Sequence, residues 1–250
     1  MTSRFAEDRV SGAGRGSWWR DYVADRRHGP LPRSVLVLTV AIGLVDAVSI
    51  LSLGRVFVAN MTGNVVFIGF ALAGAAGFSL AASLIALAGF LTGAGLAGLA
   101  IQRLGDNRAV LLRAIVAAEL VLILSAAALA SGSGAPIGNT ARDAIVALVA
   151  VALGLQNATV RRLAVPDLTT SVLTMTLTGI AADLRNRNPR VALRRSLSVI
   201  AMLAGALVGA LLVLNLSVPA AMWAATGLIA LVLLGSCLAA RQPTEWQTGK

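Results

Sequence analysis

The sequence predicts an all-α polytopic membrane protein, and three observations support this fold class. Of the 250 residues, 57% are hydrophobic and 13% are charged, and the mean hydropathy is +0.82, well outside the composition of soluble domains. Apolar runs of roughly 20 residues, enough to cross about 30 Å of hydrocarbon as a helix, recur along the chain. These runs are apolar on every face, whereas a β-barrel needs short strands of alternating polarity.

Six apolar runs predict transmembrane helices, and two further segments contain polar residues that leave their character open. The predicted spans are residues 34–53, 79–101, 110–130, 143–160, 195–214 and 218–239. The two ambiguous segments, 56–76 and 168–182, either cross the membrane or enter and leave on one face. We therefore predict about six transmembrane helices plus two re-entrant or broken polar segments. The alternative is seven or eight full spans.

The distribution of basic residues favours six spans. Cytoplasmic loops of membrane proteins carry an excess of Lys and Arg. If both ambiguous segments are re-entrant, only Arg55 and Arg142 of the 21 basic residues lie outside. Eight spans would instead move the Arg-rich loops 102–113 and 161–166 to the outer face. We expect a multi-pass protein of the bacterial plasma (inner) membrane.

The chain divides into two membrane repeats flanked by polar tails. The basic tail 1–33 and the short tail 241–250 are both expected in the cytoplasm. The repeats, 34–130 and 142–240, are joined by the linker 131–141, whose Gly, Ser and Pro content suits an outer connection. The first repeat starts inside and the second starts outside. The six-span model therefore makes them an inverted 3+3 repeat.

The repeat is visible as two divergent copies of one element. Residues 43–72 read GLVDAVSILSLGRVFVANMTGNVVFIGFAL, and residues 154–181 read GLQNATVRRLAVPDLTTSVLTMTLTGIA. The first positions align directly, as Gly43 with Gly154, Asp46 with Asn157 and Ala47 with Ala158. After a four-residue gap, the second set aligns as Asn60 with Asp167, Thr62 with Thr169 and Val65 with Val172.

Both copies place a polar box beside an intramembrane Asp or Asn. Polar groups in an apolar segment are unfavourable unless they are paired or line a cavity, and repeated membrane halves commonly meet at a midplane site. We expect a substrate pathway lined by Asp46, Asn60, Thr62, Asn64, Gln156, Asn157, Asp167, Thr169, Thr170 and Ser171. Candidate charge partners are Arg55, Glu119, Arg161 and Arg162. For Asp167 the alternative is a capping role at the start of a half-helix.

Two intramembrane acids need partners, and two glycine pairs suggest close helix contacts. Asp46 could pair with any of the three candidate arginines, and Glu119 could pair with Arg113 on its own helix. An Asp46→Asn variant should insert normally but lose or uncouple flux. The pairs Gly89 with Gly93 and Gly205 with Gly209 are GxxxG motifs, which allow two helices to pack closely.

Residue content argues against catalysis. The chain has one cysteine, Cys237, and one histidine, His28, so it cannot form an internal disulfide or a His and Cys cluster for a metal. We predict no catalytic residue, no metal site and no cofactor, and we do not expect an enzyme. The net charge of +10 follows from the topology signal, so no nucleic acid is expected. The predicted partners are the lipid bilayer, a small solute or ion, and a second copy of the chain.

The two repeat motifs resemble a known family. GLVDAVSILSLGRVFVANMTGNVVFIG and GLQNATVRRLAVPDLTTSVLTMTLTGIAAD are similar to the YoaK-like family of bacterial inner-membrane proteins (DUF1275), and the likeness covers about residues 34–240. The resemblance implies a multi-span bacterial plasma-membrane protein. It supplies no substrate, cofactor or catalytic residue.

Three function classes follow from these observations. The favoured one is a channel or secondary transporter for a small solute or ion, because inverted repeats and intramembrane polar boxes occur together. The first alternative is a non-catalytic membrane assembly or accessory protein, in which the polar residues only join helices. The second is a membrane-embedded enzyme that acts on lipid, which the lack of His, Cys and acid-rich motifs disfavours.

Overall fold

The protein is a helical bundle whose long helices match the predicted spans. The computed structural model describes residues 30–134, 136–163, 173–185 and 189–240, and every regular element within them is an α-helix. Six of these helices are long and apolar enough to cross a membrane. They are α2 (Leu31–Ser52), α4 (Leu80–Leu104), α5 (Arg108–Gly132), α6 (Asn139–Leu163), α8 (Pro189–Asn215) and α9 (Val218–Ala239). The prediction of an all-α polytopic fold with about six spans is confirmed.

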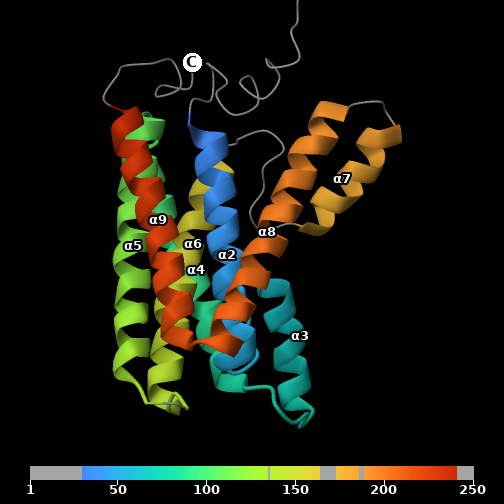
Figure 1. Ribbon diagram of the computed structural model, residues 1–250, viewed down its shortest axis with the longest axis vertical. Helices are drawn as coiled ribbons and strands as arrows, with labels where there is room; N and C mark the ends of the chain where they lie inside the picture. Colours follow the sequence, from blue (N-terminus) through green and yellow to red (C-terminus); the bar gives the residue numbers. More distant parts are fainter. Residues whose placement is uncertain (1–29, 135, 164–172, 186–188, 241–250) are drawn as a thin grey trace, which may run out of the picture.

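The two ambiguous segments contain short helices. Helix α3 (Met61–Leu72) has 12 residues and α7 (Leu173–Arg185) has 13, so each is about 18–20 Å long, less than the hydrocarbon thickness of about 30 Å. Figure 1 shows α3 beside the lower half of the bundle and α7 beside the upper half. Among the long helices described, α3 contacts α4 and α7 contacts α8. The short helices therefore attach to two different long helices, at opposite ends of the bundle.

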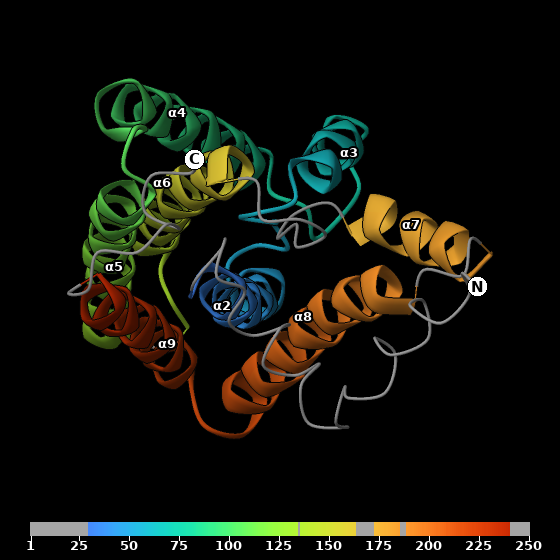
Figure 2. The same ribbon diagram turned by 90° about the horizontal axis from the view of Figure 1, so that it is seen from above.

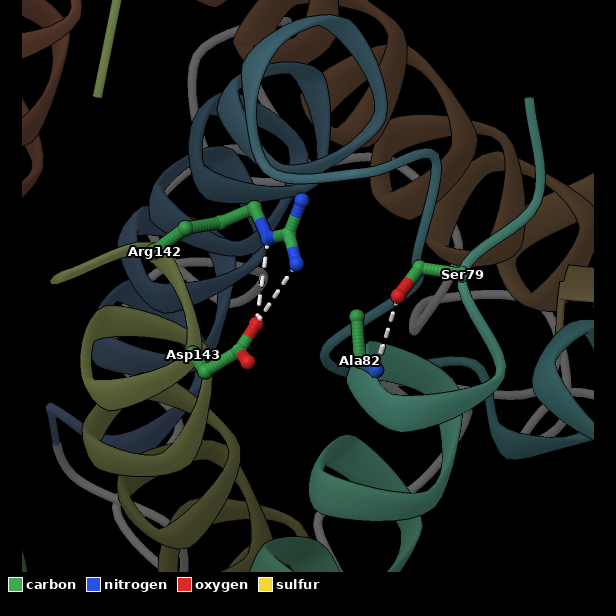
Figure 3. Close-up of polar contacts among 4 residues, drawn as sticks. All are labelled: Ser79, Ala82, Arg142 and Asp143. Atoms are coloured by element: carbon green, nitrogen blue, oxygen red, sulfur yellow. Dashed lines mark hydrogen bonds and ion pairs between the residues drawn. The ribbon is translucent and has the colours of Figure 1, made fainter. Parts of the chain in front are cut away.

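Side chains at the turns explain where several helices begin. The Ser79 hydroxyl accepts a hydrogen bond from the Ala82 amide at the start of α4, at 3.2 Å (Figure 3). Asn107 accepts from two amides of the first turn of α5, and Ser217 caps α9 in the same manner as Ser79. These caps satisfy N–H groups that have no partner within the helix.

Helices α2 and α6 lie inside the bundle, and α4 and α8 lie on its surface. In an apolar 18-residue stretch of α2 and of α6, 67% and 61% of the residues are buried, against 17% in the corresponding stretches of α4 and α8. Figure 2 shows α2 enclosed by neighbours, and its contacts are with α8, α9 and α6. The outward faces of α4 and α8 carry exposed leucines, as lipid-facing helices do.

Glycines bring α2 against α8. A Cβ atom on Gly43 of α2 would overlap the backbone of α8 at the Met202 carbonyl and the Ala206 amide. From the other side, a Cβ on Gly205 would overlap the Val40 carbonyl, and Gly209 packs on Leu44. The two backbones are therefore in direct contact, which is the geometry that small residues allow in membranes.

The same kind of crossing joins α4 to α6. A Cβ on Gly154 of α6 would overlap the Phe90 carbonyl, and one on Gly93 of α4 would overlap the Val151 carbonyl. Gly89 also packs against α6, at Ala150. Both GxxxG pairs thus serve crossings within one chain. The paired helices run in the same direction, and α2 runs opposite to α6 (Figure 1).

Candidate functional site

Asp46 anchors the connection between α2 and α3. It lies in the last two turns of α2 and is 7% exposed. One carboxylate oxygen accepts a hydrogen bond from the backbone amide of Val58 at 3.4 Å, and the neighbouring amide of Ala59 also bonds to the carboxylate. These amides belong to a non-helical stretch inside a membrane protein, where an unpaired N–H is unfavourable. The carboxylate therefore provides a hydrogen-bond acceptor for backbone N–H groups that lie outside any helix.

Asn64 is a second anchor for the same connection. Its side chain is fully buried. The amide nitrogen donates to the Phe57 carbonyl at 2.6 Å, and the amide oxygen accepts from the Phe57 amide at 2.9 Å. The Asn64 side chain thus pairs both the N–H and the C=O of Phe57, a residue that lies outside any helix. Among the members of the first polar box, Asn64 is the one that faces inward.

The other two members of that box face outward. Thr62 and Asn60 are both exposed, and the Asn60 side chain makes no capping bond to α3. Four phenylalanines pack around this helix instead, with ring centroids 5.0–5.6 Å apart between Phe57 and Phe67, between Phe67 and Phe78, and between Phe70 and Phe78. Aromatic packing together with Asn64 therefore holds α3 in place.

The turn after α2 explains the position of Arg55. Gly54 has a φ of +93° and Arg55 has a φ of +56°, so both residues adopt the left-handed conformation that reverses the chain. The Arg55 guanidinium lies against Gly77, in the loop between α3 and α4. It is thus directed along the surface and does not reach the Asp46 carboxylate.

Asp46 takes backbone amides as partners where the sequence suggested arginine. Within the described ranges it forms no ion pair with Arg55, Arg161 or Arg162, and the latter two are exposed at the end of α6. The ion pair found in those ranges joins two adjacent residues, Arg142 and Asp143, at 3.0 Å (Figure 3). The Asp46 carboxylate instead accepts its hydrogen bond from the backbone amide of Val58, in the connection that follows α2.

The second polar box is described only in part. Gln156 is 2% exposed, and Asn157 is half-buried on the same helix. The remaining predicted residues of this box lie outside the described residues: Asp167, Thr169, Thr170 and Ser171. Their expected place in a shared pathway stays a prediction.

Glu119 is fully buried near the middle of α5. Both of its carboxylate oxygens lack a hydrogen-bond partner in the described part of the chain. The partner suggested by the sequence, Arg113, turns away and donates from Nε to the Ala109 carbonyl at 3.1 Å. This direction follows from helix geometry, because side chains lean toward the N-terminus of their helix.

Helices α5 and α6 each carry a buried polar side chain without a partner among the described residues, Glu119 on α5 and Gln156 on α6. The two helices are antiparallel neighbours, and the Arg108 guanidinium donates to the Leu163 carbonyl, which joins the start of α5 to the end of α6.

Thr159 is a third buried polar residue of these two helices. It lies three residues beyond Gln156, on the same face of α6, and its hydroxyl has no partner among the described residues. Both amide atoms of Gln156 are also unpartnered within the described residues. We name Glu119, Gln156 and Thr159 the α5/α6 polar cluster. The repeat alignment does not single out Thr159, and the available signal is its helical spacing from Gln156.

Replacing Asp46 should test its anchoring role. Asp46→Ala leaves the loop amides without an acceptor, and we expect it to lower the free energy of unfolding by about 1–3 kcal/mol. Asp46→Asn keeps one acceptor oxygen and should have a smaller effect. Thermal unfolding of the purified variants in detergent measures both. An Asp46→Ala protein as stable as the wild type would contradict the anchor, and the expected loss of flux in Asp46→Asn can be measured on the same preparation.

Comparisons with known proteins agree with the membrane architecture. The family model for DUF1275, described as a protein of unknown function, matches residues 34–235. The chain is 30% identical over 156 residues to the UPF0700 transmembrane protein YoaK of Bacillus subtilis (strain 168), covering 62% of this chain and 66% of that relative. No solved structure matches. The two motif copies, the six long apolar helices and this match over most of the chain together show that the protein is a multi-pass membrane protein of the YoaK-like DUF1275 family.

Proposed function

We propose that the protein is a channel or secondary transporter for a small solute or ion in the bacterial plasma membrane. In this proposal its two halves, α2 to α5 and α6 to α9, form an inverted repeat. The main support for the proposal is that helices of one half pack against helices of the other half. The first helix of each half packs on the third helix of the other half, as α2 on α8 and α6 on α4.

The residues at these two crossings correspond one to one. Gly43 and Gly154 are aligned in the repeat, and each meets a backbone carbonyl of the opposite half's third helix. Val40 and Val151 each lie three residues before that glycine, and each carbonyl meets the glycine of the other half, Gly205 or Gly93. Independent helix pairs would have no reason to share this register.

The directions and the short helices support inversion. Equivalent helices α2 and α6 run oppositely, and α3 and α7 flank opposite ends of the bundle (Figure 1). Transporters built from inverted repeats commonly carry such broken or half-length helices, because irregular backbone is tolerated at membrane depth only where protein or a cavity surrounds it. The buried bonds of Asp46 and Asn64 to the α2–α3 connection are contacts of this type.

Flux measurements in proteoliposomes test the proposal. The purified protein should raise the permeability of vesicles to at least one class within a panel of protons, alkali cations, halides and small neutral solutes. Vesicles without protein, and vesicles that contain heat-inactivated protein at the same ratio to lipid, supply the controls. Folded, inserted wild-type protein that transports none of these classes would contradict the proposal and favour the accessory role.

The sidedness of the proposed topology makes a further prediction. The Arg108–Leu163 contact places the α4–α5 turn and the end of α6 on one face of the bundle, and the basic residues there predict the cytoplasmic face. In a Cys237→Ser background, cysteines at the exposed positions Asp106 and Arg162 should react with an impermeant thiol reagent only after permeabilisation. A cysteine at the exposed Gly134 should react in intact cells. The reverse pattern would invert the orientation.

A further inference from the structure

The α5/α6 polar cluster is surrounded by apolar residues. On the face of α5 that carries Glu119, the neighbouring turns present Ile115, Val116 and Ile123, all of them buried. The Glu119 carboxyl group itself is fully buried. An ionised carboxylate in such a place is strongly disfavoured unless a counter-charge or hydrogen-bond donor accompanies it.

No basic side chain that the structure describes neutralises Glu119. Helix α5 packs against α6, α9 and α4. On α9 the sequence has no Asp, Glu, Lys, Arg or His, and the Cys237 thiol is exposed. The charged groups of the other helices, all toward the helix ends, are Arg108 and Arg113 on α5, the paired Arg142 and Asp143 and the exposed Arg161 and Arg162 on α6, and Arg103 on α4. A proton is therefore the simplest species that neutralises the group.

The equivalent positions of the other half are apolar. The alignment of Gly43 with Gly154 places Val45 opposite Gln156 and Val48 opposite Thr159. Counting from the starts of α5 and α9 places Ile229 opposite Glu119. All three equivalents are buried at 1% exposure or less. The architecture thus accepts apolar side chains at these positions, and packing alone does not require the polar ones.

From this arrangement we infer that the α5/α6 polar cluster is an internal proton-binding site, in which Glu119 carries an exchangeable proton. A protonated carboxyl group donates as well as accepts, as do the Gln156 amide and the Thr159 hydroxyl. The bound proton removes the charge that burial among apolar residues disfavours. This inference rests on the proposed transport function for its role, because the bound proton would be the coupling ion.

Infrared spectroscopy of the full chain in lipid vesicles tests the site without knowledge of the substrate. At neutral pH the wild type should show the C=O stretching band of a protonated carboxylic acid, and transfer to D₂O should shift that band as the proton exchanges. The test uses the Asp46→Asn background, because Asp46 is the other buried acid and contributes a band of its own when protonated. In that background the band should be present, and the additional Glu119→Gln replacement should remove it. No band in Asp46→Asn, a band that survives the additional Glu119→Gln replacement, or a band that never shifts in D₂O would each overturn the inference.

Two further arms keep the test independent of folding and of transport. Uniform ¹³C-labelling of glutamate moves the Glu119 band in unmodified protein, and the other two glutamates, Glu7 and Glu245, belong to the predicted polar tails. In the Asp46→Asn background, the double variant Glu119→Ile with Gln156→Val places the apolar residue types of the other half at these positions and should fold without the band. Exchange of the carboxyl proton in D₂O is measured without any transport of solute. A negative flux assay would therefore leave the exchange result valid, and an absent exchange would leave an observed flux valid.

Discussion

Replacement of Gly93 or Gly205 by leucine is expected to abolish accumulation of folded protein in the membrane. At both positions the first side-chain atom would occupy the place of a backbone carbonyl, that of Val151 or Val40. Backbone atoms cannot move aside as a side-chain tip can, so the crossing helices must separate. Close packing is a main source of helix association in lipid, and we expect a loss of more than about 3 kcal/mol at either site.

Matched controls exist on the same two halves of the chain. At Gly95 on α4 and Gly227 on α9, no atom lies within 4 Å of the position that a Cβ atom would take, so Gly95→Leu and Gly227→Leu should accumulate as the wild type does. The measurement is the yield of monodisperse protein after detergent extraction and size-exclusion chromatography. Equal yields for Gly93→Leu and Gly95→Leu would refute the crossing as described.

Replacement of Asn64 by leucine should be the most damaging polar substitution in the described residues. Leucine has a similar volume but leaves both the amide and the carbonyl of Phe57 without partners. A buried unsatisfied group costs about 1–3 kcal/mol, so we expect a loss of about 2–5 kcal/mol in the free energy of unfolding.

Thr62 supplies the comparison for Asn64. It lies two residues away on the same short helix and is exposed, so Thr62→Leu should change the free energy of unfolding by less than about 0.5 kcal/mol. Detergent-titrated unfolding followed by tryptophan fluorescence measures both variants. Similar losses for the two variants would mean that helix α3 is sensitive to any substitution, and that the two hydrogen bonds between Asn64 and Phe57 are not the cause.

The sequence was sufficient for the spans but not for the orientation of polar groups on them. Apolar length and capping residues locate the helices because both depend on local chemistry. The first polar box, in contrast, contains Asn60, Thr62 and Asn64, and only the last faces inward. That choice depends on where α3 begins and on which turn it packs against, and neither is encoded in composition.

Partner assignment fails in the sequence for a related reason. Asp46 and Glu119 both have arginines within reach along the chain, yet Asp46 binds backbone amides and Arg113 binds the Ala109 carbonyl. A sequence displays charged side chains but conceals the unpaired backbone groups that compete for them. The GxxxG pairs show the same limit, because the motif predicts a close contact without saying whether the partner belongs to the same chain.

The exchange of partners between halves sets an order of assembly. Helix α2 is synthesised and enters the bilayer long before α8 exists, and the glycine face around Gly43 must meanwhile be covered by lipid or by the insertion machinery. Helix α4 waits in the same way for α6. A nascent chain that stops at the linker therefore holds neither of the two tight crossings. The native bundle can form only after α8 has been inserted. Insertion errors late in synthesis therefore leave a complete first half without its packing partners, and such a chain is exposed to quality-control proteases.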